Sequence, residues 1–117
     1  MARILSIAYD PMLLSTRKLI LEKHGYNVVS AEGFIQALRK CNERNYDLVI
    51  MGHSVPYDDK LALFETISRE CPVPVVSLIR GTERDLPGAA AKINPFDQQA
   101  LLDTIDRLIT QDRKERA

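Results

Sequence analysis

Short apolar segments alternate with helix-forming segments along almost the whole chain, and this alternation constrains the fold more than any other feature. Four segments have helical patterns. A chain that alternates in this way forms a parallel sheet with helices on both faces. We therefore predict an α/β domain with an open, doubly wound, five-stranded parallel sheet. The predicted strands are Arg3–Ala8, the region of Val28 and Val29, Asp47–Met51, Val75–Ile79 and the region of Ala90–Ile93.

The helix boundaries carry local signals of their own. Asp10 followed by Pro11 predicts a helix start, because aspartate caps free N–H groups and proline at the first helical position loses no hydrogen bond. A later helix begins near Gly33 and has Cys41 on its apolar side, which predicts a core position for this thiol and not a redox role. The inward-facing stripe of the first helix is predicted to be Leu13, Thr16, Leu19 and Ile20.

Length and charge limit the classes of protein to consider. The 117 residues fit a single domain over 1–117, with a charged tail over 111–117. Sixteen Lys and Arg balance sixteen Asp and Glu, which argues against a nucleic-acid binder and against binding to an anionic membrane. No apolar run approaches the ~20 residues of a membrane span, and two cysteines are too few for a disulfide framework. We expect a cytoplasmic protein.

Four segments of the chain resemble, in order, the receiver domain of two-component response regulators, which has a flavodoxin-like doubly wound fold. They are ILSIAYDP from Ile4, YDLVIMGHSVP from Tyr46, CPVPVVSLI from Cys71 and INPFD from Ile93. The second segment is the most specific, because receivers typically carry a YDLV strand there, followed by an aspartate and a proline. The resemblance covers nearly the whole chain and implies a role in phosphorelay signal transduction.

The resemblance also implies a phosphorylation site at the carboxyl ends of the strands, where open α/β sheets form their sites. A receiver carries a phosphate-accepting aspartate after the third strand and an acidic pair for Mg²⁺ after the first. It also carries a Thr or Ser after the fourth strand and a lysine after the fifth. The matching residues of this chain are Gly52, Ala8 and Tyr9, Ile79, and Asn94. We therefore expect a degenerate receiver, or pseudo-receiver, with no catalytic residue, no metal and no cofactor.

Three polar residues near these positions are candidates for a different site. Asp10 is the remaining carboxylate of the acidic cluster, although its simplest role is the helix cap. His53 and Ser54 are candidates to line the pocket, where the missing side chain of Gly52 is expected to leave space. The simpler interpretation of His53 is a solvated loop histidine.

Lys92 lies two residues before Asn94 in the predicted last strand. Because side chains alternate along a strand, Lys92 is expected on the same side of the sheet as Asn94. We hypothesise that Lys92 extends into the pocket and forms an ion pair with Asp10 or Asp59. The simpler interpretation is a lysine that passes the strand end and extends into water.

The segment between the last two strands is short for a receiver. Residues 79–94 are on the order of two helical turns shorter than the receiver interval that contains the fourth helix. Pro87 and Gly88 also interrupt any helix there. We predict that this helix is missing or reduced to about one turn, which is expected to expose apolar surface. A protein partner or a second copy of the chain is then expected to dock on the last helix and on Arg80–Pro87.

The sequence supports one leading function and two alternatives. The leading interpretation is a receiver-like signalling module that acts through protein contacts, without phosphorylation at Gly52. The first alternative is a receiver-like domain that binds a small ligand in the pocket of Gly52, because α/β sheets bind ligands at this position. The second is a regulator phosphorylated at a non-standard residue, Asp10 or His53.

Overall fold

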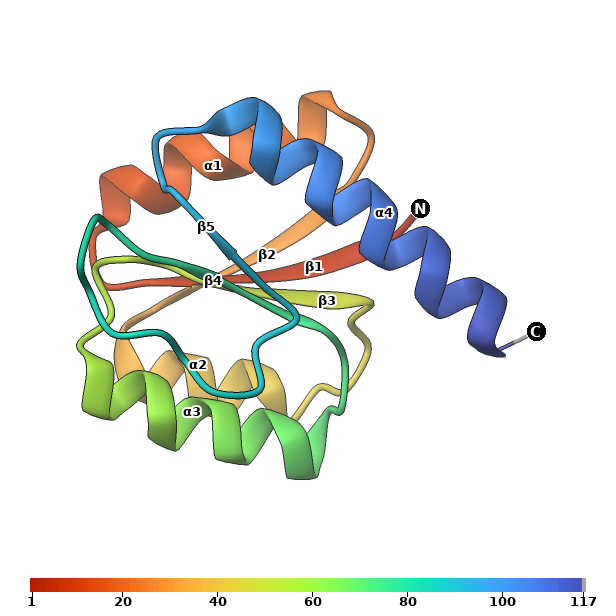
Figure 1. The fold of residues 1–117 in the computed structure, drawn as a ribbon. Coiled ribbons are helices and arrows are strands. Elements are labelled where there is room, and N and C mark those ends of the chain that lie inside the picture. Colours follow the sequence, from red (N-terminus) through yellow and green to blue (C-terminus); the bar gives the residue numbers. More distant parts are fainter. Residues whose placement is uncertain (117) are drawn as a thin grey trace.

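A computed structural model of the protein shows a five-stranded, fully parallel sheet (Figure 1). It describes the backbone of residues 1–116 and the side chains of residues 1–112. Across the sheet, the strands are β2 (Asn27–Glu32), β1 (Arg3–Ala8), β3 (Leu48–Met51), β4 (Val75–Leu78) and β5 (Ala91–Ile93). The predicted α/β class and the parallel sheet are confirmed.

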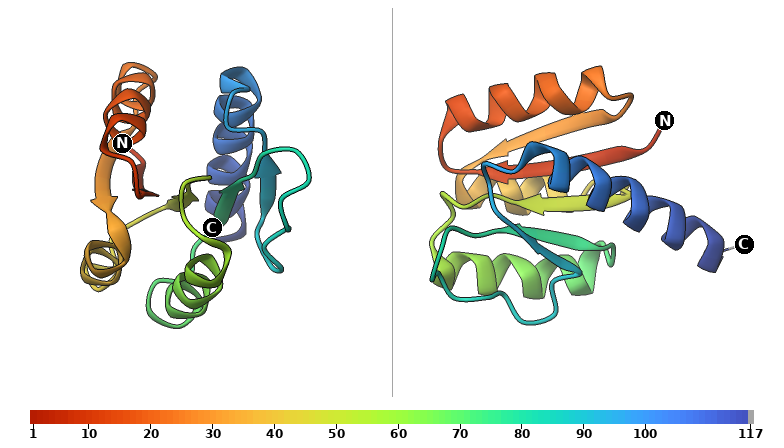
Figure 2. Two further views of the ribbon diagram at one scale, coloured as in Figure 1. Left: turned by 90° about the vertical axis from the view of Figure 1, so that its left-hand side faces the viewer. Right: turned by 45° about the horizontal axis from the view of Figure 1, so that its top comes forward.

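Helices cover both faces of this sheet. They are α1 (Pro11–Lys23), α2 (Gly33–Cys41), α3 (Tyr57–Glu70) and α4 (Gln98–Arg116). Helices α1 and α4 lie on one face and α2 and α3 on the other, so the domain has three layers (Figure 2). Two apolar clusters fill the spaces between the layers. Among the described residues, no helix is both long and apolar enough to cross a membrane.

The predicted start of α1 at Asp10 is confirmed, and α4 begins with a similar side-chain cap. Asp10 caps α1, because its side chain accepts a hydrogen bond of 2.9 Å from the Met12 backbone N–H. Asp97 lies directly before α4, and its side chain accepts 3.0 Å from the Ala100 backbone N–H. Helix α4 continues through much of the predicted charged tail, to Arg116, while Ala117 lies outside the described residues.

The inward face of α1 differs from the prediction. The buried residues are Leu14, Arg17 and Leu21, whereas Leu19 is 71% exposed. The buried side of α1 is therefore shifted by about one residue from the prediction, and it packs against β1 and β2. The aliphatic part of Arg17 can pack in this apolar layer, whereas a sequence pattern predicts that a charged residue faces solvent.

The segment between β4 and β5 contains no helix among its residues, all of which are described, so the prediction of a missing fourth receiver helix is confirmed. The expected exposed apolar surface is not found there. Leu86 is 2% exposed and belongs to the cluster under α2 and α3. Gly88 lies so close to Phe64 that an added Cβ would be 2.8 Å from its ring. The loop therefore covers the core that a helix would otherwise cover.

Candidate functional site

The candidate site lies at the carboxyl ends of the strands, around Ala8, Gly52, Ile79 and Asn94, and we call this region the carboxyl edge. Gly52 directly follows β3, and its N–H donates 2.8 Å to the Ile7 carbonyl of β1. A Cβ on Gly52 would lie 2.8 Å from that same carbonyl oxygen and 3.2 Å from the Ala8 Cβ. The expectation that Gly52 leaves space is therefore wrong, because backbone and side-chain atoms already surround that position.

The positions of the receiver's acidic pair have other roles. Ala8 is fully buried. The Tyr9 hydroxyl donates 2.6 Å to the Asp59 carboxylate, and the Tyr9 N–H donates 2.9 Å to the Ser54 hydroxyl. Burial and the Asp59 carboxylate raise the pKa of Tyr9 above its usual range. These contacts tie the end of β1 to α3 and to the loop before it.

The metal that the receiver resemblance implies does not fit these residues. Asp10 caps α1 with its carboxylate, and Asp59 accepts from Tyr9. Within residues 1–112, whose side chains are described, no three His, Cys, Asp or Glu side chains group in a way that could hold a metal ion. Mg²⁺ needs several oxygen ligands in near-octahedral geometry, and the carboxyl edge does not supply them.

Ile79 and Asn94 make local backbone contacts. The Ile79 N–H donates 3.1 Å to the Ile93 carbonyl, which extends the pairing of β4 with β5. The Asn94 side chain accepts 2.9 Å from the Phe96 N–H, a turn between β5 and α4. Neither side chain offers a charge or a hydroxyl at the carboxyl edge.

Lys92 does not reach the carboxyl edge. Its ammonium lies 2.6 Å from the Asp85 carboxylate, and both side chains are about half exposed. The hypothesis of an ion pair with Asp10 or Asp59 is therefore wrong. The reason is the loop between β4 and β5, which brings Asp85 alongside β5 and supplies a nearer carboxylate.

Two buried cations at this edge were missed by the sequence analysis. Lys60 of α3 is 3% exposed, and its ammonium donates 2.9 Å to the Leu78 carbonyl and 3.2 Å to the Ser77 hydroxyl. Arg17 of α1 is 8% exposed, and its Nη1 would lie 3.5 Å from a Cβ on Gly52. Burial lowers the pKa of both groups. No sequence motif marks either residue. Arg17 is buried because of the orientation of α1, and Lys60 because of the packing of α3.

His53 is half-buried beside these cations. Its Nδ1 atom is buried and has no hydrogen-bond partner among the described residues. Burial lowers the pKa of His53, and the charges of Arg80 and Arg17 lower it further. The His53 ring lies 5.9 Å from the Phe96 ring, measured between centroids.

The two cysteines lie together in the core, away from the carboxyl edge. The Sγ atoms of Cys41 and Cys71 are 2.7 Å apart, and the residues are 1% and 4% exposed. Burial raises the pKa of Cys41, and it raises that of Cys71 to about 12. The core position predicted for Cys41 is confirmed. Cys41 ends α2 and Cys71 directly follows α3, so the two thiols meet where the ends of these helices lie together.

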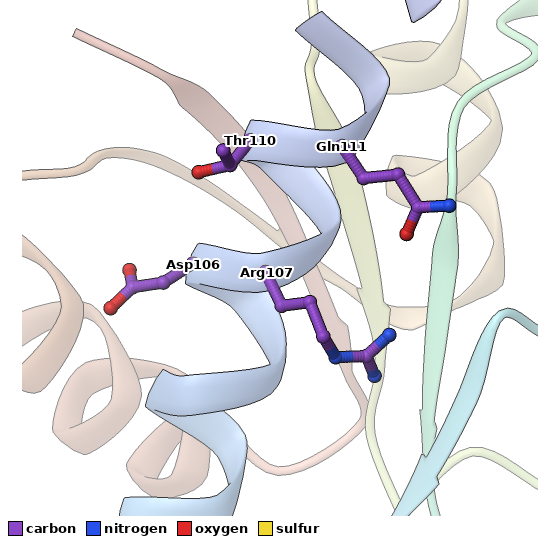
Figure 3. Close-up of a pocket in the computed structure, with 4 residues that line it drawn as sticks. All are labelled: Asp106, Arg107, Thr110 and Gln111. Carbon is purple, nitrogen blue, oxygen red and sulfur yellow. The ribbon is translucent and has the colours of Figure 1, made fainter. Parts of the chain in front are cut away.

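A shallow hollow on α4 is lined by Asp106, Arg107, Thr110 and Gln111 (Figure 3). The Asp106 carboxylate accepts a hydrogen bond from the Tyr26 hydroxyl and lies 3.3 Å from the His24 ring nitrogen. An adjoining hollow includes Ala2 and Gly25, so this region belongs to the opposite, amino-terminal edge of the sheet. The contacts hold α4 against the loop after α1.

Strand order β2-β1-β3-β4-β5, with two helices on each face and polar groups gathered at the carboxyl edge, defines a flavodoxin-like doubly wound domain. No protein-family model matches the chain. The transcriptional regulatory protein GlrR of Escherichia coli K12 is 32% identical over 120 residues, which cover 94% of this chain and 27% of that protein.

Solved structures share the fold. NtrX from Brucella abortus superposes with a TM-score of 0.84 at 25% identity, over 99% of this chain and 28% of that one. The N-terminal domain of a response regulator/sensory box/GGDEF 3-domain protein from Carboxydothermus hydrogenoformans superposes with a TM-score of 0.83 at 22% identity, over 98% of this chain and 99% of that one. The chain is a receiver domain of the response regulator type, and it spans about a quarter of the length of its curated relatives.

Proposed function

We propose that this receiver domain transmits signals through protein contacts and is not phosphorylated at position 52. The contact between Gly52 and β1 carries the proposal. A side chain on residue 52 would begin 2.8 Å from the Ile7 carbonyl oxygen, so an aspartate there requires the backbone to shift. The phosphate-accepting group is therefore missing, and the backbone has closed around its position.

The other residues at the carboxyl edge support the same proposal. A receiver-type phosphoryl transfer needs cations that neutralise the transferred group and a carboxylate that attacks it. Here the carboxylates of Asp10 and Asp59 are engaged by the Met12 N–H and the Tyr9 hydroxyl. We assign no catalytic residue to the domain.

Phosphorylation at a non-standard residue is the weaker alternative. Asp10 would lose its helix cap if its carboxylate were esterified, at a cost of about 1 kcal/mol. His53 is half-buried and keeps its Nδ1 inside. The ligand-binding alternative has one observation in its favour: Arg17 Nη1 and His53 Nδ1 are buried polar atoms near the carboxyl edge that have no hydrogen-bond partner among the described residues.

The contact surface that we propose consists of α4 and Arg80–Pro87. The loop has charged side chains on its outer side. The guanidinium of Arg84 lies 4.3 Å from the centroid of the Tyr57 ring, and Asp85 forms an ion pair with Lys92. Leu86 fixes the loop to the core. Sedimentation velocity at rising concentration distinguishes the two kinds of partner. A mass approaching twice that of the chain identifies a second copy as the partner, and a constant mass excludes it.

Amide NMR spectra recorded with Mg²⁺ and beryllofluoride, a mimic of a phosphoryl group, test the central part of the proposal. We expect no saturable shifts at Gly52 or Asp10. Saturable shifts at Gly52 and its neighbours would overturn it, because they would show that the edge still accepts a phosphoryl mimic with its metal. Shifts confined to Asp10 or His53 would favour the non-standard acceptor instead.

A further inference from the structure

Two thiols meet in the core on the face of the sheet that α2 and α3 cover (Figure 1). The Sγ atoms of Cys41 and Cys71 are 2.7 Å apart, although the two residues are 30 positions apart in the sequence. Both are free thiols, and the chain contains 2 cysteines in all. A buried cysteine on its own is chemically inert. The adjacent second thiol gives this pair a reaction that neither residue could undergo alone.

The backbone holds both residues in place for a bond between their sulfur atoms. Cys41 is the last residue of α2, and its carbonyl accepts a hydrogen bond of 3.2 Å from the Arg44 N–H. Cys71 directly follows α3, and its N–H donates 2.9 Å to the Ile67 carbonyl. A disulfide bond is about 2.05 Å long, so the sulfur atoms need to approach by about 0.7 Å. Rotation of the side chains supplies a change of this size without a movement of the helices.

A hollow at the amino-terminal edge of the sheet gives small molecules a route to the pair. It is lined by residues 44–47, which follow α2, and by residues 70–73 at the end of α3. Cys71 is one of the lining residues and is 4% exposed, whereas Cys41 is 1% exposed and does not line the hollow. The small exposed fraction of Cys71 favours a reagent of the size of hydrogen peroxide over a bulky disulfide.

The surroundings of the thiols determine how fast they react. Burial raises the pKa of Cys41 and Cys71, which keeps both sulfur atoms protonated and slows their attack on an oxidant. The Arg44 guanidinium lowers both pKa values, but the Glu70 carboxylate raises them and lies 2.8 Å from Arg44. We therefore expect a slow reaction that responds to sustained oxidation and not to a brief pulse of oxidant.

We propose that Cys41 and Cys71 form a reversible redox modification site, in which hydrogen peroxide converts the two thiols into a disulfide bond that joins α2 to α3. The Cys71 thiol gives its proton to water, and the thiolate attacks one oxygen of the peroxide. The O–O bond breaks, hydroxide leaves, and Cys71 becomes a sulfenic acid. This inference does not depend on the proposed function.

The second step forms the disulfide. The Cys41 thiol attacks the Cys71 sulfur, the S–O bond breaks, and the hydroxide that leaves takes up the thiol proton. The two sulfur atoms together lose two electrons and two protons, and the peroxide is reduced to two molecules of water. A dithiol reductant restores both thiols by thiol–disulfide exchange.

The disulfide closes a loop of the chain that contains β3 and all of α3. Because a closed loop restricts the unfolded chain, we expect the oxidised domain to melt about 10 °C above the reduced one. A melting temperature that does not rise on oxidation would contradict the fit of the disulfide to the native fold.

Intact mass and thiol labelling of the whole folded chain test the proposal. The chain is reduced with a dithiol, separated from the reductant, kept with hydrogen peroxide, and then alkylated in denaturant. We expect a loss of two hydrogens, no alkylated cysteine, a monomer on a non-reducing gel, and recovery of both thiols with the dithiol. Two alkylated cysteines, a disulfide-linked dimer, or oxygen added to cysteine without a disulfide would overturn the proposal.

Cys41→Ala and Cys71→Ala are a matched pair of variants, because each keeps one of the two thiols. Neither variant should lose two hydrogens. With peroxide and a diketone reagent that labels sulfenic acids, Cys41→Ala should be labelled faster, because its remaining thiol lines the hollow. Equal labelling, or faster labelling of Cys71→Ala, would overturn the order of the two steps. If a variant does not fold, the mass of the unaltered chain still decides whether the disulfide forms.

Discussion

At the scale of single residues, the loss of the receiver's phosphorylation site that we propose involves space as well as chemistry. Gly52 lies where β1 and β3 approach each other, and a Cβ added to it would meet both a carbonyl oxygen and a methyl group. Among the five glycines, it is the one whose neighbours include β-strand backbone and whose φ is not in the left-handed region. Its role is close approach of the chain, not a turn.

Gly52→Ala is expected to lower the free energy of unfolding by about 1–3 kcal/mol, because the added methyl group overlaps the Ile7 carbonyl. Urea denaturation measures the change. Thr16→Ala, at an exposed position of α1, is the control and should stay within about 0.5 kcal/mol of the unaltered chain. A neutral or stabilising Gly52→Ala would show that the strands have room at this point.

The lowered pKa of His53 predicts a dependence of stability on pH. In the folded state the ring resists protonation, so the unfolded state binds more protons as pH falls below about 6.5. Stability attributed to His53 is complete above that pH and decreases below it. We expect His53→Gln to flatten this decrease in unfolding measurements at several pH values.

His24→Gln is the matched control for the pH series, because the chain has two histidines and His24 lies at the opposite edge, beside Asp106. A flattening of equal size in both variants would contradict the role given to the cations around His53.

At the scale of elements, the segment between β4 and β5 is a loop that is anchored at two points. Leu86 is 2% exposed although neither of its neighbours is buried. The contact between Gly88 and Phe64 adds a second fixed point on α3. The loop is therefore part of the core of the domain despite its lack of secondary structure.

Leu86→Ala is expected to cost about 2–5 kcal/mol, the range for truncating a buried leucine. Thr82→Ala, in the exposed part of the same loop, should change stability little. Thermal or urea unfolding measures both variants. A cost for Leu86→Ala no larger than that for Thr82→Ala would mean that the loop does not contribute to the core.

The elements also show what a sequence pattern can predict. The strands, the Asp10 cap and the missing helix follow from apolar runs, proline and glycine, whose effects are local. Arg17 and Lys60 could not be found in this way, because a long cation in a helix pattern reads as solvent-facing and only packing against β1 or β4 buries it. Lys92 was misplaced because Asp85 approaches through the loop, a contact that periodicity does not contain.

At the scale of the whole molecule, sixteen basic side chains balance sixteen acidic ones, but the two kinds are not evenly distributed. The carboxylates of Asp10 and Asp59 at the carboxyl edge are engaged in a cap and a tyrosine contact. Arg17 and Lys60 lie buried nearby, and neither forms an ion pair with a carboxylate within residues 1–112. At the amino-terminal edge, a carboxylate is the central group, since Asp106 of α4 contacts both Tyr26 and His24. The receiver fold is thus combined with two buried cations, Arg17 and Lys60, near the carboxyl edge.

The most direct measurement of the central claim is the intact mass of the whole chain after incubation with Mg²⁺ and a small phosphoryl donor such as acetyl phosphate. A receiver that contains its phosphate-accepting aspartate, treated in parallel, shows that the donor is active. The account predicts that this chain keeps its unmodified mass. A gain of one phosphoryl group, mapped to the segment around Gly52, would contradict it.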